Sequence, residues 1–156
     1  MNQYLFNIDF LDFLKALNDK QVEYILVGGY AVVLHGYNRN TGDMDIWVNA
    51  TAENYNKLTK AFYAFGMPTF DMTLEKFLLT DQYDVFSFGR PPVCIDILTM
   101  VKGLYFAETF NRVEYVDIKE NLSIPILCLA DLIVAKKAAG RAKDIDDIEN
   151  LLPPSL

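Results

Sequence analysis

Two aspartates interrupt a strongly apolar segment, Asp43-Met-Asp-Ile-Trp-Val48. Polar and apolar residues that alternate with a period of two are typical of a β-strand, whose successive side chains point to opposite faces. We therefore expect Asp43 and Asp45 on one face of a sheet, with Met44 and Ile46 in a core on the other face. Two neighbouring carboxylates resist ionising together, so this strand is expected to border water or a bound cation.

A third aspartate, Asp96, stands in the middle of a second apolar run, Val93–Leu98. A carboxylate buried in a strand is costly unless it is paired or binds a metal. If this strand lies beside the first, the three carboxylates can hold two divalent ions, an arrangement that catalyses displacement at phosphorus. Mg²⁺ or Mn²⁺ would suit such oxygen ligands. The alternative is that Asp96 accepts backbone hydrogen bonds or pairs with Arg90.

Gly28 and Gly29 separate an expected buried strand, 23–27, from an expected short helix, 30–34. Exposed N–H groups at such a turn can hold a phosphate, and glycines let it approach the backbone closely. A simple turn would use the same two residues. The turn lies one strand–helix–strand unit before Asp43, and this position favours the phosphate site.

Composition limits the classes of protein that remain. With 156 residues, 52% of them hydrophobic, the chain is expected to form a single domain over 1–156. Its net charge of −7 argues against tight, non-specific binding of long nucleic acids. Cys94 and Cys128 lie in apolar runs and are expected to be buried, reduced thiols. With no basic leader and no apolar run of membrane length, we expect a soluble, cytoplasmic protein with no membrane partner.

Periodicity and turn residues outline the order of the elements. Helices are expected at 8–20, 30–34, 51–65, 104–110, 129–139 and 143–152, and strands at 23–27, 43–48, 83–88, 93–98, 113–116 and 124–127. The third and fourth strands are expected to form a hairpin around a four-residue loop, 89–92. This order predicts an α/β (α+β) domain with a mostly β centre.

The Gly28-Gly29 turn, the segment from Arg39 to Asp45 and the strand residue Asp96 together resemble the nucleotidyltransferase superfamily, which has a polymerase-beta-like fold. The stretch 27–48 looks like small bacterial nucleotidyltransferases of the abortive-infection type IV toxin kind. The stretch 129–147 is similar to the basic C-terminal helix of those proteins. The resemblance covers about 23–152 and implies a mixed central sheet flanked by helices.

The same resemblance implies Mg²⁺, or Mn²⁺, and a nucleoside triphosphate such as ATP as substrate. Carried over by position, Asp43 and Asp45 bind both ions, and Asp96 holds the catalytic ion and helps to activate the acceptor hydroxyl. Gly28 and Gly29 cradle the triphosphate. Two departures accompany the match. The second glycine stands where active members often have serine, and the next residue is a tyrosine instead of a small polar residue.

In the C-terminal stretch, the resemblance implies that Lys136 contacts the triphosphate and that Asp144 orients either Lys136 or Arg141. The residues alone leave other roles open. The basic group is either an anion pocket or a solvated helix end; it comprises Lys136, Lys137, Arg141 and Lys143. The sequence Asp144-x-Asp146 is expected on spacing alone to lie on a solvated helix face.

Four further residues are of interest, and Arg39 and Trp47 have two possible roles each. Arg39, four residues before Asp43, is expected either to steer a phosphate or to pair with Asp43. His35 is expected to be structural. Trp47 is expected to pack in the core, with stacking on a nucleotide base as the alternative. Tyr37 is a weak candidate for contact with the nucleotide.

The leading interpretation is a magnesium-dependent nucleotidyltransferase whose acceptor is an RNA end, a protein or a small molecule. A shallow groove, or a partner chain in a homo-oligomer, would hold that acceptor. The alternative is a non-catalytic module with the same fold, such as an antitoxin or a regulatory partner in a toxin–antitoxin pair. A third possibility is a small-molecule modifier similar to lincosamide or aminoglycoside nucleotidyltransferases.

Overall fold

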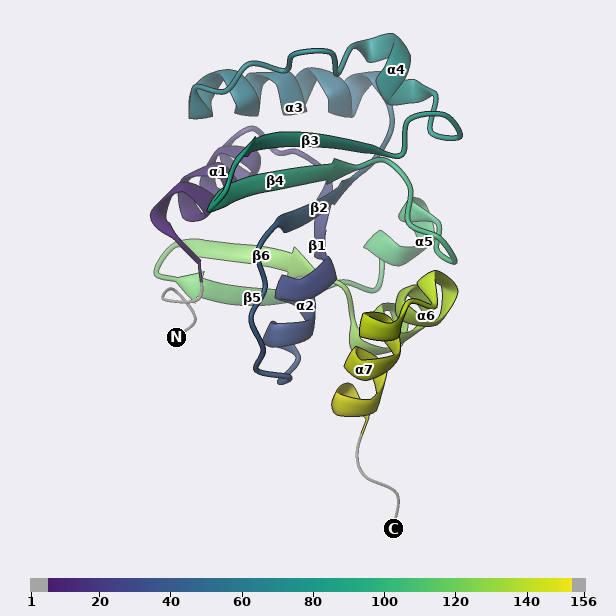
Figure 1. The fold of residues 1–156 in the computed structure, drawn as a ribbon. Helices are drawn as coiled ribbons and strands as arrows, with labels where there is room; N and C mark the ends of the chain where they lie inside the picture. Colours follow the sequence, from purple (N-terminus) through teal and green to yellow (C-terminus); the bar gives the residue numbers. More distant parts are fainter. Residues whose placement is uncertain (1–5, 153–156) are drawn as a thin grey trace.

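The computed structural model describes residues 6–152, which form seven helices and six strands (Figure 1). The helices are α1 (Ile8–Asp19), α2 (Gly28–Leu34), α3 (Ala52–Phe65), α4 (Leu74–Leu78), α5 (Phe106–Phe110), α6 (Leu129–Ala139) and α7 (Ala142–Leu151). The strands are β1 (Tyr24–Val27), β2 (Met44–Val48), β3 (Val85–Arg90), β4 (Val93–Leu98), β5 (Glu114–Lys119) and β6 (Leu122–Ile126).

All six strands join one sheet in the order β3-β4-β2-β1-β6-β5. β2 pairs in parallel with β4, and β1 pairs in parallel with β6, while the other three pairings are antiparallel. The predicted fold class, a mixed central sheet flanked by helices, is confirmed. The parallel pairing of β2 with β4 brings together two acidic segments that lie about fifty residues apart in the sequence.

The two faces of the sheet are buried by different helices. Met44 and Ile46 point into the larger core, where α1 and α3 contribute Phe13 and Phe62, and all four side chains are fully buried. Figure 1 shows α3 running along this side of the sheet. Trp47, with its neighbours on the opposite face, packs against residues of α2, α5 and α6. The alternation expected for this strand is therefore confirmed.

Capping residues set the ends of the predicted helices. Asn7 Oδ1 accepts a hydrogen bond from the N–H of Phe10 at the start of α1, with an N···O distance of 2.9 Å. Thr51 Oγ1 does the same for α3. Gly66 and Gly140 end α3 and α6 in the left-handed conformation, which glycine adopts without steric cost. These ends lie within one or two residues of the prediction.

The structure differs from the sequence-based expectations in three local features. α4 was not predicted, because five residues give too short a periodic pattern to recognise. The hairpin turn is shorter than 89–92, since Gly89 still pairs with Cys94 and the strands close around Pro91–Pro92. Cys94 and Cys128 are half-buried rather than buried, because Cys94 shares a face with the aspartates and Cys128 precedes the first turn of α6. Among residues 6–152, no helix has the length and apolar character that crossing a bilayer requires.

Candidate functional site

The acidic residues form a row across two adjacent strands. In the parallel pairing of β2 with β4, Asp45 stands directly opposite Asp96. The two acidic strands are neighbours, as predicted. Asp45 and Asp96 lie on one face of the sheet, and Met44 points to the opposite face. Asp43 precedes β2 and is exposed, whereas Asp45 and Asp96 are half-buried. Asp96 therefore faces a second carboxylate rather than pairing with Arg90.

Burial and mutual repulsion raise the pKa of one carboxylate in this row. Burial, followed by the charges of Asp96 and Asp43, raises the pKa of Asp45 to about 7, and Lys136 acts in the opposite direction. At neutral pH without a cation, Asp45 is therefore close to half-protonated. A positive ion at this position would relieve the repulsion and favour the fully ionised row.

The two glycines at the start of α2 lie beside the acidic strand β2 and the loop before it. Gly28 has a φ of 67°, and a Cβ atom there would collide with the carboxylate of Asp45. A Cβ atom on Gly29 would collide with the Thr41 hydroxyl. The two glycines are the first residues of α2, so the predicted helix begins two residues earlier than expected. Both positions favour glycine for close packing, and Gly28 also favours it for its left-handed conformation. The role of these glycines toward a phosphate remains a prediction.

Lys136 is buried between two carboxylates of α7. Its Nζ lies 3.2 Å from Asp144 Oδ1 and 2.9 Å from Asp147 Oδ2. Asp144 also accepts a hydrogen bond from Arg141 Nε, with an N···O distance of 2.7 Å. The expectation that Asp144 lies on a solvated face was wrong, because these ion pairs hold it fully buried; only Asp146 is exposed. The geometry lets Asp144 hold both cations in place.

Asp147 is a site residue that the sequence reasoning missed. It accepts two hydrogen bonds from Arg39, at 2.7 Å from Nε and 2.9 Å from Nη2, while it also pairs with Lys136. The prediction that Arg39 pairs with Asp43 was therefore wrong. Asp147 lies three residues after Asp144, on the same side of α7, and this spacing was the available signal.

The two α7 carboxylates that pair with Lys136 have lowered pKa values. Burial acts to raise the pKa of Asp144, but hydrogen bonds from Arg141 and Lys136 outweigh it and lower the pKa below its ordinary value. The pKa of Asp147 is lowered for the same reason, by hydrogen bonds from Arg39 and Lys136 that outweigh burial. Three cations and two carboxylates leave this cluster with one net positive charge.

A pocket of about 190 Å³ connects the acidic row to the basic cluster. Its polar lining comprises Gly28, Asp45, Lys102, Lys136, Arg141 and Asp144, and its apolar lining includes Leu98, Val101 and Leu132. Lys137 and Lys143 are exposed and do not line this pocket. Of the four clustered basic residues, Lys136 and Arg141 therefore line the pocket. Arg39 pairs with Asp147, which in turn contacts the pocket residue Lys136.

The carboxylate oxygens of the row are the donors that Mg²⁺ and Mn²⁺ prefer. Within residues 6–152, however, no group of three His, Cys, Asp or Glu side chains already has the geometry of a metal site. The donor chemistry therefore fits a hard divalent ion, and an ion would have to draw the carboxylates together.

Three other candidates have structural contacts. His35 Nε2 lies 2.6 Å from the carbonyl oxygen of Leu127. Trp47 is buried and meets the Phe106 ring edge to face, with 5.2 Å between ring centroids. Tyr37 donates a hydrogen bond to Asp146 at 2.8 Å. His35 and Trp47 thus have the structural environments expected of them.

Residues 4–152 match a family model described as nucleotidyltransferase of unknown function (DUF6036). In fold, the chain is similar to a protein from Thermotoga maritima whose crystal structure carries a provisional assignment as a nucleotidyltransferase. The TM-score is 0.59 at 14% sequence identity, and the match covers 90% of this chain and 88% of that chain. That likeness concerns the fold alone. No curated protein matches the chain in sequence.

Proposed function

Because this chain belongs to the DUF6036 family of nucleotidyltransferases of unknown function, we propose that it transfers a nucleoside monophosphate from a magnesium-bound triphosphate to a hydroxyl group. The observation that carries this proposal is the pairing of Asp45 with Asp96 on adjacent parallel strands. Burial, together with repulsion within the row, raises the pKa of Asp45 to about 7, and the adjoining pocket contains Lys136 and Arg141.

The chemistry requires one bond to form and one to break. The acceptor oxygen bonds to the α-phosphorus, the bond from that phosphorus to the bridging oxygen breaks, and pyrophosphate leaves. Divalent ions bound at the row would stabilise the attacking and leaving oxygens. Asp96 lies on the outer side of the row and would take the acceptor proton. Positioning and electrostatic stabilisation would supply most of the rate.

On the other side of the row, the basic cluster would bind the β- and γ-phosphates. Lys136 is held by two carboxylates and so has a fixed position. The Arg141 side chain is 60% exposed, although it is paired with Asp144. Arg141 can therefore turn toward a phosphate at small cost, while Lys136 stays in place as a fixed charge.

Calorimetry tests this proposal directly. Mg²⁺ and each of the four common nucleoside triphosphates are titrated into the wild type and into an Asp43→Ala/Asp45→Ala double variant. We expect metal-dependent binding of at least one triphosphate by the wild type and none by the variant. Asp117→Ala removes an exposed carboxylate from β5 and serves as the control, with binding unchanged. Failure of the wild type to bind any triphosphate with Mg²⁺ or Mn²⁺ would refute the proposal.

A non-catalytic binding module is the second candidate, and one observation favours it. The described residues contain no ready-made metal geometry, and two of the cations that line the pocket, Lys136 and Arg141, already have carboxylate partners. Such a module would bind a partner protein without divalent ions or triphosphate. The same calorimetry separates the two candidates, because only the enzyme requires both ligands.

A further inference from the structure

The two edge strands of the sheet differ in how well they are protected from other chains. Within residues 6–152, no strand pairs with the outer side of β3 or of β5 (Figure 1). β5 carries Glu114, Asp117 and Lys119, and its ladder shifts register between the last two. Charges and bulges are devices that keep an edge from pairing with another chain. From Val85 to Gly89, β3 has no charge, and its ladder with β4 is regular. β3 is therefore the less protected edge.

Two charges flank the uncharged part of β3 at equal distances from its centre. Asp84 lies three residues before Ser87, and Arg90 lies three residues after it. Both are exposed, and neither forms an ion pair within residues 6–152. Asp84 continues the line of the strand, because its carbonyl oxygen accepts a hydrogen bond from the N–H of Thr99 at 3.0 Å. The edge thus has a negative group at one end and a positive group at the other.

We propose that two copies of the chain pair through β3, as antiparallel strands related by a two-fold axis at Ser87. In a two-fold interface, if residue i contacts residue j, then residue j contacts residue i. Residues at equal distances before and after the centre therefore lie opposite each other. Asp84 lies opposite Arg90 of the second copy, and the same pair forms again at the other end. No other centre brings the two charges opposite each other, so this register is the one that charge complementarity selects.

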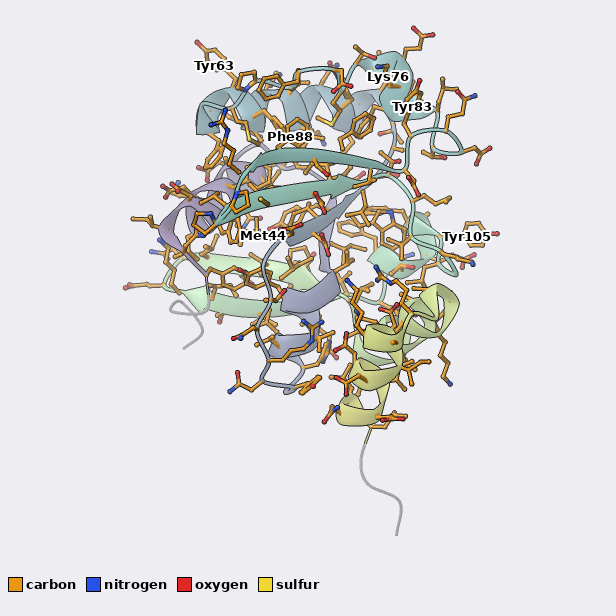
Figure 2. All side chains as sticks on the ribbon, in the orientation of Figure 1. Met44, Tyr63, Lys76, Tyr83, Phe88 and Tyr105 are labelled. Carbon is orange, nitrogen blue, oxygen red and sulfur yellow. The ribbon has the colours of Figure 1, made fainter. Side chains whose placement is uncertain are left out.

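The same register pairs aromatic side chains on the face of the sheet that α3 covers. Phe86 and Phe88 each lie one residue from Ser87, so Phe88 lies opposite Phe86 of the second copy. Phe88 points from β3 toward α3 (Figure 2), with 4.8 Å between its ring centroid and that of Phe62. The Phe70 ring stacks on Phe88 at 6.3 Å, although Phe70 is 71% exposed. Aromatic pairs across neighbouring strands are favourable, and this pair would extend an aromatic cluster whose outer ring faces water.

The charges and the aromatic rings fit together because alternate residues of a strand share a face. Asp84, Phe86, Phe88 and Arg90 alternate along β3 with Val85, Ser87 and Gly89. A two-fold axis perpendicular to the sheet keeps each face on the same side in both copies. The opposite charges of the two copies therefore meet beside the aromatic pairs, next to a groove of about 520 Å³ that is lined in part by Phe70, Ser87 and Arg90.

This dimer does not involve the pocket beside the acidic row. No residue of β3 lines that pocket. The two β4 strands, which carry Asp96, would lie three strand spacings apart, about 14 Å. This separation exceeds the Debye length of about 8 Å at physiological salt, so repulsion between the two rows is largely screened. Dimerisation therefore needs neither a triphosphate nor a divalent ion, and the inference does not depend on the proposed function.

Sedimentation velocity of the full-length protein tests the dimer. One strand from each copy makes a small interface, and small interfaces are weak. We therefore expect a reversible dimer with a Kd on the order of 10–100 µM, measured between about 5 and 500 µM protein.

Charge reversal tests the predicted partners. Arg90→Asp and Asp84→Arg each place like charges opposite each other at both ends of the interface, and each should weaken the dimer about tenfold. The two variants change the net charge in opposite directions, so a loss in both cannot come from overall repulsion. The double variant Asp84→Arg/Arg90→Asp restores opposite charges and should return the Kd to within about threefold of wild type. Asp117→Arg, at an exposed position of β5, is the control and should change nothing.

Cysteine cross-linking tests the register. Ser87→Cys places two thiols opposite each other, with Cα atoms about 4.5–5.5 Å apart in either kind of antiparallel pair, a distance that a disulfide spans. Val85→Cys is the matched control, because the two copies of residue 85 lie four residues apart along the strands, about 13 Å. Cys94 and Cys128 are replaced by serine in both proteins. After oxidation, denaturing gels should show a covalent dimer for Ser87→Cys only.

Four results would each overturn the inference. The first is a wild type that stays monomeric up to about 500 µM. The second is a dimer that neither single charge reversal weakens, and the third is a charge swap that does not restore it. The fourth is cross-linking at position 85 equal to that at position 87. Thermal unfolding of each variant checks that it is folded, and the cross-linking pair does not depend on the charge variants.

Discussion

At the scale of single residues, the carboxylate of Asp45 affects both the free energy of unfolding and the proposed activity. Its pKa is raised to about 7 in the folded protein, above the ordinary value near 4 in an unfolded chain. The folded state therefore binds more protons than the unfolded state between about pH 4 and pH 7, and stability falls as the pH rises through this window. A divalent ion bound at the row, as proposed, would remove this cost.

Asp45→Asn should reverse this loss. The amide keeps the shape of the carboxyl and carries no charge, so in EDTA at pH 8 the variant should be more stable than the wild type, on the order of 2–4 kcal/mol. At pH 4 the two proteins should have nearly the same free energy of unfolding. Urea unfolding at both pH values measures the difference. A wild-type stability that rises steadily from pH 4 to pH 8 with no gain in the variant would contradict the assignment.

Asp147 has the opposite effect, because its charge is required in the folded state. Asp147→Ala leaves the buried Lys136 with one carboxylate and removes the partner of Arg39. Breaking a buried pair from one side costs about 3–5 kcal/mol, and we expect a loss of that order in urea unfolding at pH 7. Asp146→Ala, at the exposed neighbouring position, should cost less than about 1 kcal/mol. Equal losses in the two variants would show that the buried network is not what stabilises α7.

At the scale of elements, the sequence predicted nearly every helix and strand because each carries its own periodic pattern and capping residues. It also predicted the acidic strands, since a charge inside an apolar run is conspicuous. The contacts of Asp144 with Lys136 and Arg141 were implied by the family resemblance. The pairing of Arg39 and Lys136 with Asp147 was not predictable from the sequence. Those contacts depend on how α6 and α7 dock on the sheet, and local spacing does not encode that docking.

The turn between β1 and α2 gives an element-scale prediction. Gly28→Ala places a Cβ atom against Asp45 at a φ of 67°, and the left-handed conformation alone costs a non-glycine residue about 1–2 kcal/mol. We expect destabilisation of at least that size, together with displacement of Asp45 and loss of metal-dependent triphosphate binding. Gly42→Ala is the control, because a Cβ atom at Gly42 meets open space. Calorimetry and thermal unfolding of both variants measure the contrast.

At the scale of the whole molecule, charge is distributed unevenly around the acidic row. The chain has 21 acidic and 14 basic residues, and the cations nearest the row, Lys136 and Arg141, lie on the α6–α7 side, paired with carboxylates. Phosphates are therefore attracted to one side of the row only. The other side, from β4 to β3, has no comparable basic cluster among the described residues.

This asymmetry predicts weak binding of generic RNA. Non-specific binding draws its free energy from cationic contacts with phosphates and weakens steeply with salt. Because the net charge is −7, a fluorescent 20-nucleotide RNA should show no binding tighter than about 10⁻⁴ M at 150 mM salt, the weak end of the usual non-specific range. Fluorescence anisotropy at 50 and 150 mM salt makes the measurement. Micromolar binding with a steep salt dependence would instead indicate a basic surface beside the row, and the acceptor would then be sought among RNA ends.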